Sequence, residues 1–390
     1  MASAGASEHV RLTTIAREWG RIGCVGFGGP PTHIALLRRI CVDEHGWLSA
    51  RDFEDAIAAT NLLPGPASTQ LAIFCAWRLR GVPGALLGGA CFIVPGLVVI
   101  LALSALFLAG HPPRWVEGAA AGAGAAVPAV ALHAASGLVP ASWRRAPADR
   151  RARTRWLAYL VLGGAASALV GPWLALFLVA CGLAETAVRS RSRALPPGPV
   201  AVLPFAAVGG AVGGLLALCW VAIKVGALSF GGGFVIIPLM QHDAVTTYHW
   251  MTGAQFLSAV ALGQVTPGPV VQTVAVVGYA AAGIGGGLLA ALVAFAPSFV
   301  FVLAGGRHFD RLRASARVQA FLAGAGPAAV GAIAGAAVPL GMALAHLWQV
   351  GLLGLALASL FVARRGVVSA LVGAGVLGVV AALGGAPVPR

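Results

Sequence analysis

The sequence predicts an all-α polytopic membrane protein made of two inverted-topology repeats, with broken or re-entrant helices in each. Three observations predict it. Hydrophobic residues fill 59% of the 390 positions and charged residues only 10%, and apolar runs long enough to cross a bilayer recur along the chain. Motifs of the first half return about 203 residues later. Arginines in matching connections alternate between the halves, which indicates opposite orientations in the membrane.

The duplication is carried by a glycine motif and a Pro-Gly-Pro motif in each half. The matched positions are Arg21 with Lys224, Phe27-Gly28-Gly29-Pro30 with Phe230-Gly231-Gly232-Gly233, Trp47 with Trp250, Pro64-Gly65-Pro66 with Pro267-Gly268-Pro269, Gln70 with Gln272, and Pro95 with Pro297. Such a duplication is typical of transporters whose halves share one central site. The predicted parts are a tail over residues 1–9, a first membrane repeat over 10–188, a cytoplasmic linker over 189–199 and a second membrane repeat over 200–390.

Each repeat is expected to begin with two broken helices, one at the glycine motif and one at Pro-Gly-Pro. The segment from Phe53 to Leu79 has arginines near both ends, and each of its arms is shorter than the about 20 residues that a spanning helix needs. We therefore predict a re-entrant hairpin that turns at Pro-Gly-Pro. The alternative is a broken helix that crosses once.

Four spans complete each repeat, and the arginines between them set the orientation. The predicted spans are 84–109, 118–140, 156–170 and 172–188 in the first half, and 285–304, 319–340, 343–363 and 366–384 in the second. Around Pro-Gly-Pro and after the second span, arginines stand only in the first half; between the two long spans they gather in the second half, at Arg307, Arg311, Arg313 and Arg317. Because Lys and Arg mark the cytoplasmic side, the halves are predicted to be inverted.

Composition also excludes several classes of function. The net charge of +14 comes from arginines between apolar segments, so we assign it to membrane orientation and expect no nucleic acid partner. The six cysteines form no C-x-x-C pair, so neither a metal nor a cofactor is expected. The sequence contains no H-E-x-x-H motif and no P-loop, which argues against an enzyme.

The Pro-Gly-Pro motifs are candidate anion sites. A helix that starts after such a turn has unpaired backbone amides at the positive end of its dipole, and this end binds oxyanions well. The candidate residues are Asn61, Pro64, Gly65, Pro66, Ser68 and Thr69 in the first half, and Gln264, Pro267, Gly268 and Pro269 in the second. The glycine motifs are expected to present similar helix starts at Phe27, Gly28, Gly29 and Pro30, and at Phe230, Gly231 and Gly232. The alternatives are a structural helix break and close helix packing.

Arg21 and Lys224 hold the same place in each repeat, six residues before Phe-Gly-Gly. A basic residue in both copies is a candidate partner of the anion, and snorkelling toward the interface is the alternative. Four further residues are candidates for a coupling proton or for ordinary packing: Glu18, His33, His133 and Glu185. His242 and Asp243 are expected in a solvated loop.

These paired motifs resemble the chromate ion transporter family in its long form, with two fused homologous halves. The resemblance covers residues 10 to 385 and departs at Gly233, which stands where the first half has Pro30. It implies a protein of the bacterial inner membrane that exports chromate and confers chromate resistance, with the motif residues above as its site. Sulfate or molybdate transport and an anion channel remain alternatives. Proton or counter-ion coupling and a homodimer stay open.

Overall fold

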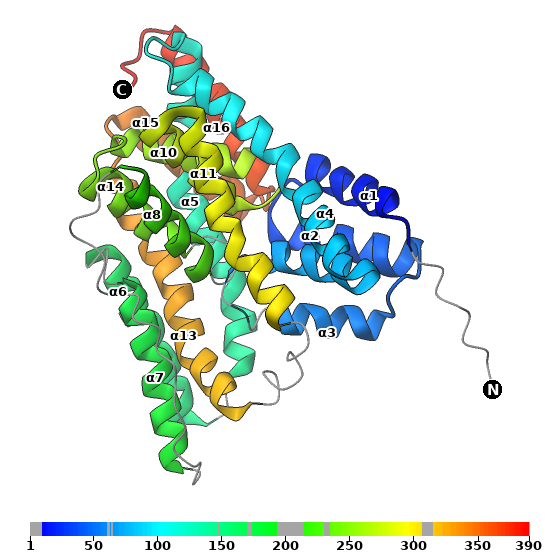
Figure 1. The fold of residues 1–390 in the computed structure, drawn as a ribbon. Coiled ribbons are helices and arrows are strands. Elements are labelled where there is room, and N and C mark those ends of the chain that lie inside the picture. The colour runs from blue at the N-terminus through cyan, green and yellow to red at the C-terminus, as the bar shows by residue number, and fades with distance from the viewer. Residues whose placement is uncertain are drawn as a thin grey trace, which may run out of the picture.

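The computed structural model describes residues 10–60, 63, 65–146, 149–169, 174–192, 214–229, 235–305 and 315–389. Within these ranges the chain is helical and contains no strand (Figure 1). Five of the predicted site residues, namely Asn61, Pro64, Phe230, Gly231 and Gly232, lie outside the described residues, as do the tail over 1–9 and most of the linker.

The first half contains seven α-helices and one π-helix within the described ranges. They are α1 (Leu12–Val25), α2 (Pro30–Arg38), η1 (Arg39–Glu44), α3 (Ala50–Thr60), α4 (Ala67–Phe107), α5 (Arg114–Arg145), α6 (Arg150–Leu169) and α7 (Leu174–Ser192). The break between α1 and α2 falls at the glycine motif, where Gly28 and Gly29 have φ of 98° and 78°. Residues other than glycine rarely adopt these positive backbone angles, because their Cβ atom would clash with the backbone. Glycine at both positions therefore permits the turn.

The second half repeats the order. Its elements are α8 (Leu215–Leu228), α9 (Ile236–Gln241), η3 (His242–Thr247), α10 (Gly253–Val265), η4 (Val270–Gln272), α11 (Thr273–Gly305), α13 (Ala316–Gly335), α14 (Ala337–Met342), α15 (Leu347–Leu357), η5 (Ala358–Val362) and α16 (Val367–Leu383). Helices therefore occupy the predicted spans in both halves.

The two halves share their backbone irregularities as well as their motifs. The π-helices η1 and η3 stand at matching repeat positions. The long helices α4 and α11 are each interrupted by a glycine in an equivalent conformation, Gly81 with φ 61° and Gly283 with φ 62°. Because such departures are rare and cost free energy, their recurrence indicates that both copies of the motif region fold alike.

At these glycines the chain doubles back on itself. A Cβ built on Gly88 would lie 2.5 Å from the Cβ of Ala76, although twelve helical residues rise about 18 Å in a straight helix. In α11, Gly278 and Gly286 approach each other's carbonyl groups in the same way. Each of these helices is thus a hairpin whose two arms touch through residues without bulky side chains.

The predicted hairpin around the first Pro-Gly-Pro motif has its two ends close together. Asp52 near the start of α3 lies 4.0 Å from Arg78 near the end of the first arm of α4. Arg38 on α2 forms a 2.6 Å ion pair with Glu54. The arginines on both sides of the motif therefore lie at one end of this pair of helices, and the re-entrant path through the membrane stays a prediction.

The two halves interlock. Helix α5 of the first half packs along α16 of the second, and α13 of the second half packs against α6 and α7 of the first, while α4 contacts α11. In the α5–α16 contact, Gly118 and Gly122 face Gly378 so closely that a side chain on any of them would meet backbone atoms. Small residues at such crossings let membrane helices approach.

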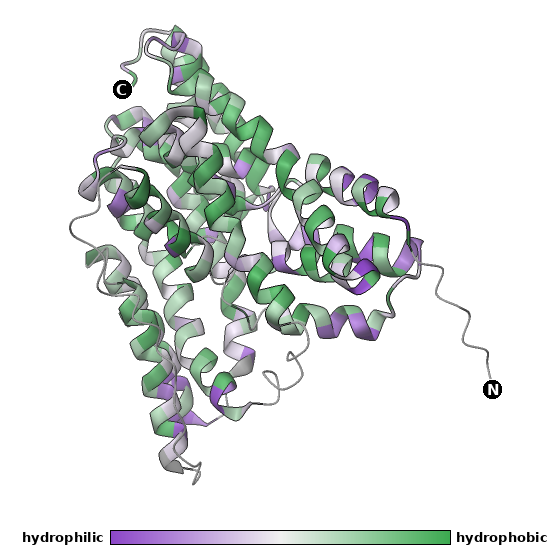
Figure 2. Cartoon of the chain, in the orientation of Figure 1, coloured by the Kyte–Doolittle hydropathy of each residue, from purple (hydrophilic) through white to green (hydrophobic). Residues whose placement is uncertain are grey.

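The surface is suited to a bilayer. Within the described ranges, four helical stretches are long and apolar enough to cross a membrane: Ala67–Phe107, Arg114–Arg144, Val270–Gly305 and Ala316–Met342. Figure 2 shows hydrophobic residues along most helices, and hydrophilic residues along α3 and near the lower ends of α7 and α13. Many large apolar side chains on these helices are exposed, such as Val98 and Leu292.

Candidate functional site

The two Pro-Gly-Pro turns end in buried helix starts that no side chain caps. Gly65 has φ 123° and Gly268 has φ 92°, so both turns need glycine. Pro66 and Pro269 are the N-cap residues, and neither helix start has a side-chain cap. The first bonded amide is that of Gln70, which donates to the Pro66 carbonyl at 3.0 Å. The preceding amides therefore have no acceptor within the helix.

The first turn of α4 also contains a buried hydroxyl that lacks a hydrogen-bond partner. Ser68 is 2% exposed and Thr69 is fully buried. Within the described ranges, Thr69 Oγ1, Ser229 Oγ, Gln264 Nε2 and Ser298 Oγ are buried and have no hydrogen-bond partner. An unsatisfied buried donor costs about 1–3 kcal/mol. The Thr69 hydroxyl, in the first turn of α4, and the Gln264 amide, three residues before Pro267, are donors next to the two turns. Donors of this kind beside an uncapped helix start favour a ligand that is rich in acceptor oxygens.

Each Pro-Gly-Pro turn packs on the first helix of the other half. The Gly268 amide donates to the Gly26 carbonyl at the end of α1, with an N–O distance of 3.0 Å. A Cβ built on Gly65 would lie 3.3 Å from the Gly226 carbonyl near the end of α8. Gln272 Nε2 also donates to the Ile93 carbonyl of α4 at 2.8 Å. The structure thus brings Gly65, Pro66, Ser68 and Thr69 to the same junction between the halves as Pro267, Gly268 and Pro269.

His33 lies at the centre of this junction. It is fully buried on α2. Its Nε2 is 2.9 Å from the Gly26 carbonyl and its Nδ1 is 3.2 Å from Ser68 Oγ. The ring packs edge-on against Phe92 with centroids 5.0 Å apart. The sequence identified His33 only as one of four candidates for a coupling proton. Its position directly after the glycine break was the signal that could have ranked it first.

The two basic residues of the repeat have different surroundings. The Arg21 side chain is 61% exposed, and its guanidinium is 4.0 Å from Glu18. The Lys224 side chain is 13% exposed, and its Nζ is 2.5 Å from Asp243 Oδ2 and 5.6 Å from the centre of the Trp220 ring. Both cations thus already have an acidic neighbour in this structure.

The prediction of a solvated loop at His242 and Asp243 is wrong. Both residues belong to the π-helix η3, and Asp243 is 4% exposed. The apolar neighbours of η3 exclude water, and the ion pair with Lys224 compensates for burial of the carboxylate. Sequence alone did not show this pairing, because nineteen positions separate the two residues.

The first glycine motif offers fewer donors than Pro-Gly-Pro. Helix α2 begins with Pro30 and Pro31, which have no amide hydrogen. The amide of His33 already bonds to the Gly29 carbonyl at 3.2 Å, so Thr32 alone has a free amide in this first turn. Phe27 is 42% exposed. The first glycine motif, Phe27, Gly28, Gly29 and Pro30, is thus more exposed than the Pro-Gly-Pro turns and offers fewer donors.

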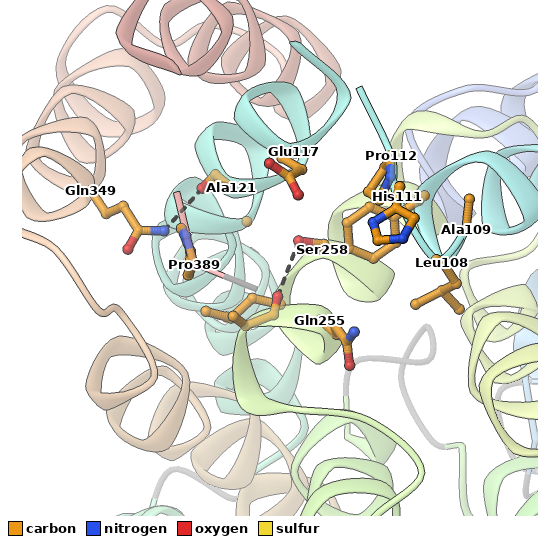
Figure 3. Close-up of a pocket in the computed structure, with 15 residues that line it drawn as sticks. Leu108, Ala109, His111, Pro112, Glu117, Ala121, Gln255, Ser258, Gln349 and Pro389 are labelled. Carbon is orange, nitrogen blue, oxygen red and sulfur yellow. Dashed lines mark hydrogen bonds between the residues drawn. The ribbon is translucent and has the colours of Figure 1, made fainter. Parts of the chain in front are cut away.

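A separate cavity of about 250 Å³ is lined by residues of both halves and by none of the Pro-Gly-Pro residues (Figure 3). Its wall consists of the α4–α5 connection with Gly110 and His111, the start of α10 with Gln255 and Ser258, and Gln349 of α15. Gln349 and His111 lie on opposite sides of the cavity in Figure 3, with Glu117 between them. Ser258 donates to Ala254, and Gln349 donates to Ala121. All three wall segments carry the few-arginine signature that predicts the periplasmic side.

Comparisons with known proteins agree with this architecture. The family model described as chromate transporter matches two regions of the chain, residues 13–186 and 216–379. The chain belongs to the chromate transporter family. Each match falls within one of the predicted repeats. The family and the apolar helices indicate that the protein is a multi-pass membrane protein.

Several relatives of the chain are named chromate transport proteins. The chain is 31% identical to a chromate transport protein of Cupriavidus metallidurans, covering 87% of this chain and 86% of that protein. It is 29% identical to a probable chromate transport protein of Synechococcus elongatus, covering 88% of each chain. It is 31% identical to a chromate transport protein of Pseudomonas aeruginosa, covering 84% of this chain and 80% of the other. No solved structure matches the chain.

Proposed function

We propose that this protein is a secondary transporter that exports chromate, a tetrahedral divalent oxyanion, across the bacterial inner membrane and so confers chromate resistance. The observation that carries the proposal is the pair of buried, uncapped helix starts at the two Pro-Gly-Pro turns, with the unpartnered Thr69 hydroxyl at the first and the unpartnered Gln264 amide just before the second. Amides and hydroxyls at helix starts favour an oxyanion over a cation or a sugar. Two relatives are named chromate transport proteins, which favours chromate among the oxyanions.

The proposed site lies between the two halves. Ser68, Thr69 and the amides after Pro66 contribute from the first half, and Gln264 and the amides after Pro269 from the second. Lys224 and Arg21 supply positive charge nearby, each released from its acidic neighbour when the dianion binds. While no anion is bound, the ion pair with Asp243 compensates for the buried charge of Lys224.

Alternating access follows from the way that the halves interlock. Inverted repeats that rock about a central site expose it to one side at a time. The meeting ends of the α3–α4 hairpin at Asp52 and Arg78 support re-entrant helices. The cavity at Gly110, Gln255 and Gln349 is then the periplasmic vestibule, because all three segments are predicted to face that side.

Flux of labelled chromate in proteoliposomes of known orientation tests the proposal. We expect saturable chromate transport, competition by sulfate and molybdate, and a rate that changes with an imposed proton gradient. Net flux from the cytoplasmic to the periplasmic face under that gradient supports export. Non-saturable flux would identify a channel, and preference for sulfate or molybdate over chromate would replace the substrate. Gly65→Ala at matched protein abundance is the internal control, since it disturbs one turn without adding charge.

A further inference from the structure

We propose that His33 is the proton-binding residue of this transporter, and that its protonation turns the Ser68 hydroxyl from the imidazole ring toward the bound oxyanion. This inference rests on the proposed oxyanion site at Pro-Gly-Pro. It names the residue that couples the anion to a proton and gives the sign of that coupling.

The first step is the state of the ring. The Gly26 carbonyl can only accept hydrogen bonds. His33 Nε2, at 2.9 Å from this oxygen, must therefore carry a hydrogen. In the neutral ring the other nitrogen, Nδ1, is then a bare acceptor. Ser68 Oγ, 3.2 Å away, consequently donates its hydrogen to Nδ1.

The second step is what a proton changes. A proton on Nδ1 makes this nitrogen a donor as well. Ser68 Oγ must then accept from the ring, and its own hydrogen becomes free to point elsewhere. Ser68 is the second residue of α4, beside the uncapped amides and the unpartnered Thr69 hydroxyl. The freed hydrogen therefore adds a donor to the proposed anion site, and the charged ring adds an attraction.

The third step is the connection between the halves. The Gly26 carbonyl receives both the His33 ring and the Gly268 amide of the opposite Pro-Gly-Pro turn, at 2.9 Å and 3.0 Å. Both lone pairs of that oxygen are thus in use. A change in the charge of the ring acts on a hydrogen bond that joins the two halves, which is where alternating access requires movement.

No other titratable side chain in the described part of the chain contacts the His33 ring. The ring contacts Gly26, Ser68 and Phe92, which are neutral. The elements packed against α2 are α1, η1 and α4. Their titratable side chains and that of α2 itself are Arg17, Glu18, Arg21, Cys24, Arg38, Arg39, Cys41, Asp43, Glu44, Cys75, Arg78, Arg80 and Cys91. In the described part of the chain none of them hydrogen-bonds or ion-pairs with the ring.

The proposal predicts that proton and anion bind together. The anion stabilises the protonated ring, so by linkage the proton strengthens anion binding. This is the opposite sign to a proton and an anion that displace each other from one site. Chromate affinity should therefore be highest at low pH and fall as the pH rises.

The experiment is equilibrium binding of labelled chromate to the purified full-length protein over a range of pH. Wild type is compared with His33→Gln, whose amide can still donate to the Gly26 carbonyl but cannot titrate. At each pH both proteins meet the same mixture of chromate and hydrogen chromate, so the ratio of their Kd values cancels the protonation of the anion. We expect this ratio to change about tenfold over the range in which the buried ring loses its proton, sampled from about pH 5 to about pH 8.

His133→Gln is the matched control, because His133 is a histidine of α5 whose ring packs on Phe361 away from this junction. It should keep the wild-type pH dependence. If the ratio of the Kd values of His33→Gln and wild type does not change with pH, the proposal is overturned. Chromate binding by wild type in the same experiment would still support the proposed function. Loss of the pH dependence in His133→Gln instead of His33→Gln also overturns it. Absence of chromate binding by wild type at every pH contradicts the proposed function.

A second measurement applies if His33→Gln does not accumulate in the membrane. Chromate is added to wild-type protein and to His133→Gln in weakly buffered solution at about pH 8, and the proton change is recorded. Both should take up protons, by roughly a few tenths of a proton per protein, as a tenfold coupling implies. Release of protons, or no change on binding, overturns the proposal.

Discussion

Thr69 shows how a single residue can be placed for binding at the expense of stability. It is fully buried, and its hydroxyl has no partner in the structure. A protein that only needed to fold would favour valine here, because valine has the same shape and leaves no polar atom unpaired. The hydroxyl is explained if an oxyanion accepts from it during transport.

Replacing Thr69 by valine should therefore change stability and transport in opposite directions. Thr69→Val should raise the free energy of unfolding by about 1–3 kcal/mol, since it removes an unsatisfied polar group. It should lower the chromate transport rate by roughly 10- to 150-fold, because a hydrogen bond to a charged group contributes about 1.5–3 kcal/mol. The thermal midpoint in detergent and proteoliposome flux measure the two effects.

Thr60→Val is the matched control for Thr69→Val. Thr60 is equally buried, but its hydroxyl donates to the Ala56 carbonyl at 2.9 Å within α3. Its replacement should leave transport unchanged. Wild-type transport by Thr69→Val at matched abundance would remove this hydroxyl from the proposed site.

The ion pair of Lys224 and Asp243 permits a separation of folding from binding. Lys224→Met leaves a buried, unpaired carboxylate, which costs about 3–5 kcal/mol, so the variant should accumulate poorly in the membrane. The double variant Lys224→Gln/Asp243→Asn removes both charges and should restore abundance. Its transport per molecule should stay about tenfold below wild type if Lys224 contacts the anion, a loss of about 1.4 kcal/mol. Full transport by the double variant would make Lys224 a structural residue only.

Among the elements, α4 decides where the two Pro-Gly-Pro turns lie. Its first arm begins at one turn, and its second arm supports the other. Gly96 faces the Pro267 carbonyl so closely that a Cβ there would overlap this oxygen. Ile93 of the same arm accepts from Gln272. The second Pro-Gly-Pro turn thus packs against α4 of the first half, and at Gly96 only a glycine leaves room for the Pro267 carbonyl.

Substitution of Gly96 by alanine should therefore be destabilising, although alanine favours helices by about 1 kcal/mol over glycine. Gly96→Ala should displace the second turn, lower membrane abundance and reduce chromate binding. Gly137→Ala on α5 is the control, because nothing lies within 4 Å of its Cβ position. That variant should be neutral or more stable by about 0.5–1 kcal/mol. Equal behaviour of the two variants in thermal unfolding would show that the contact at Pro267 relaxes without cost.

For the whole molecule, the orientation of the halves is the property on which alternating access depends. The wall of the cavity combines Gly110 of the first half with Gln255 and Gln349 of the second. These segments come together in space, and the arginine pattern predicts that all three face the periplasm. Two copies inserted in the same direction would place corresponding segments on the same face and would not reproduce this pattern.

Cysteine labelling in a background without the six native cysteines tests this orientation. Cysteines at Gly110 and at Ala345 should react with a membrane-impermeant reagent from the periplasm. A cysteine at Arg150 should react only from the cytoplasm. Reaction of Ala345 and Arg150 positions from the same face contradicts inverted repeats, whatever the transport activity of the variants.

The sequence by itself determined the class of the protein, the repeat and the motifs. Apolar runs, glycines that permit positive φ and prolines that end helices act locally, so the helices, the breaks at Gly28–Gly29 and the turns at Gly65 and Gly268 could be predicted from neighbouring residues. The family resemblance was likewise visible in the paired motifs and is confirmed by the match over both halves.

Only the tertiary structure decided which partners these residues have. The contact of Gly268 with Gly26 spans the two halves. The burial of Asp243 beside Lys224 and the placement of His33 between Gly26 and Ser68 also depend on how helices pack. Such contacts join residues far apart in the chain, and their free energy depends on burial, which local sequence patterns do not encode. The same motif, repeated at Arg21 and Lys224, therefore has an exposed cation in one half and a buried ion pair in the other.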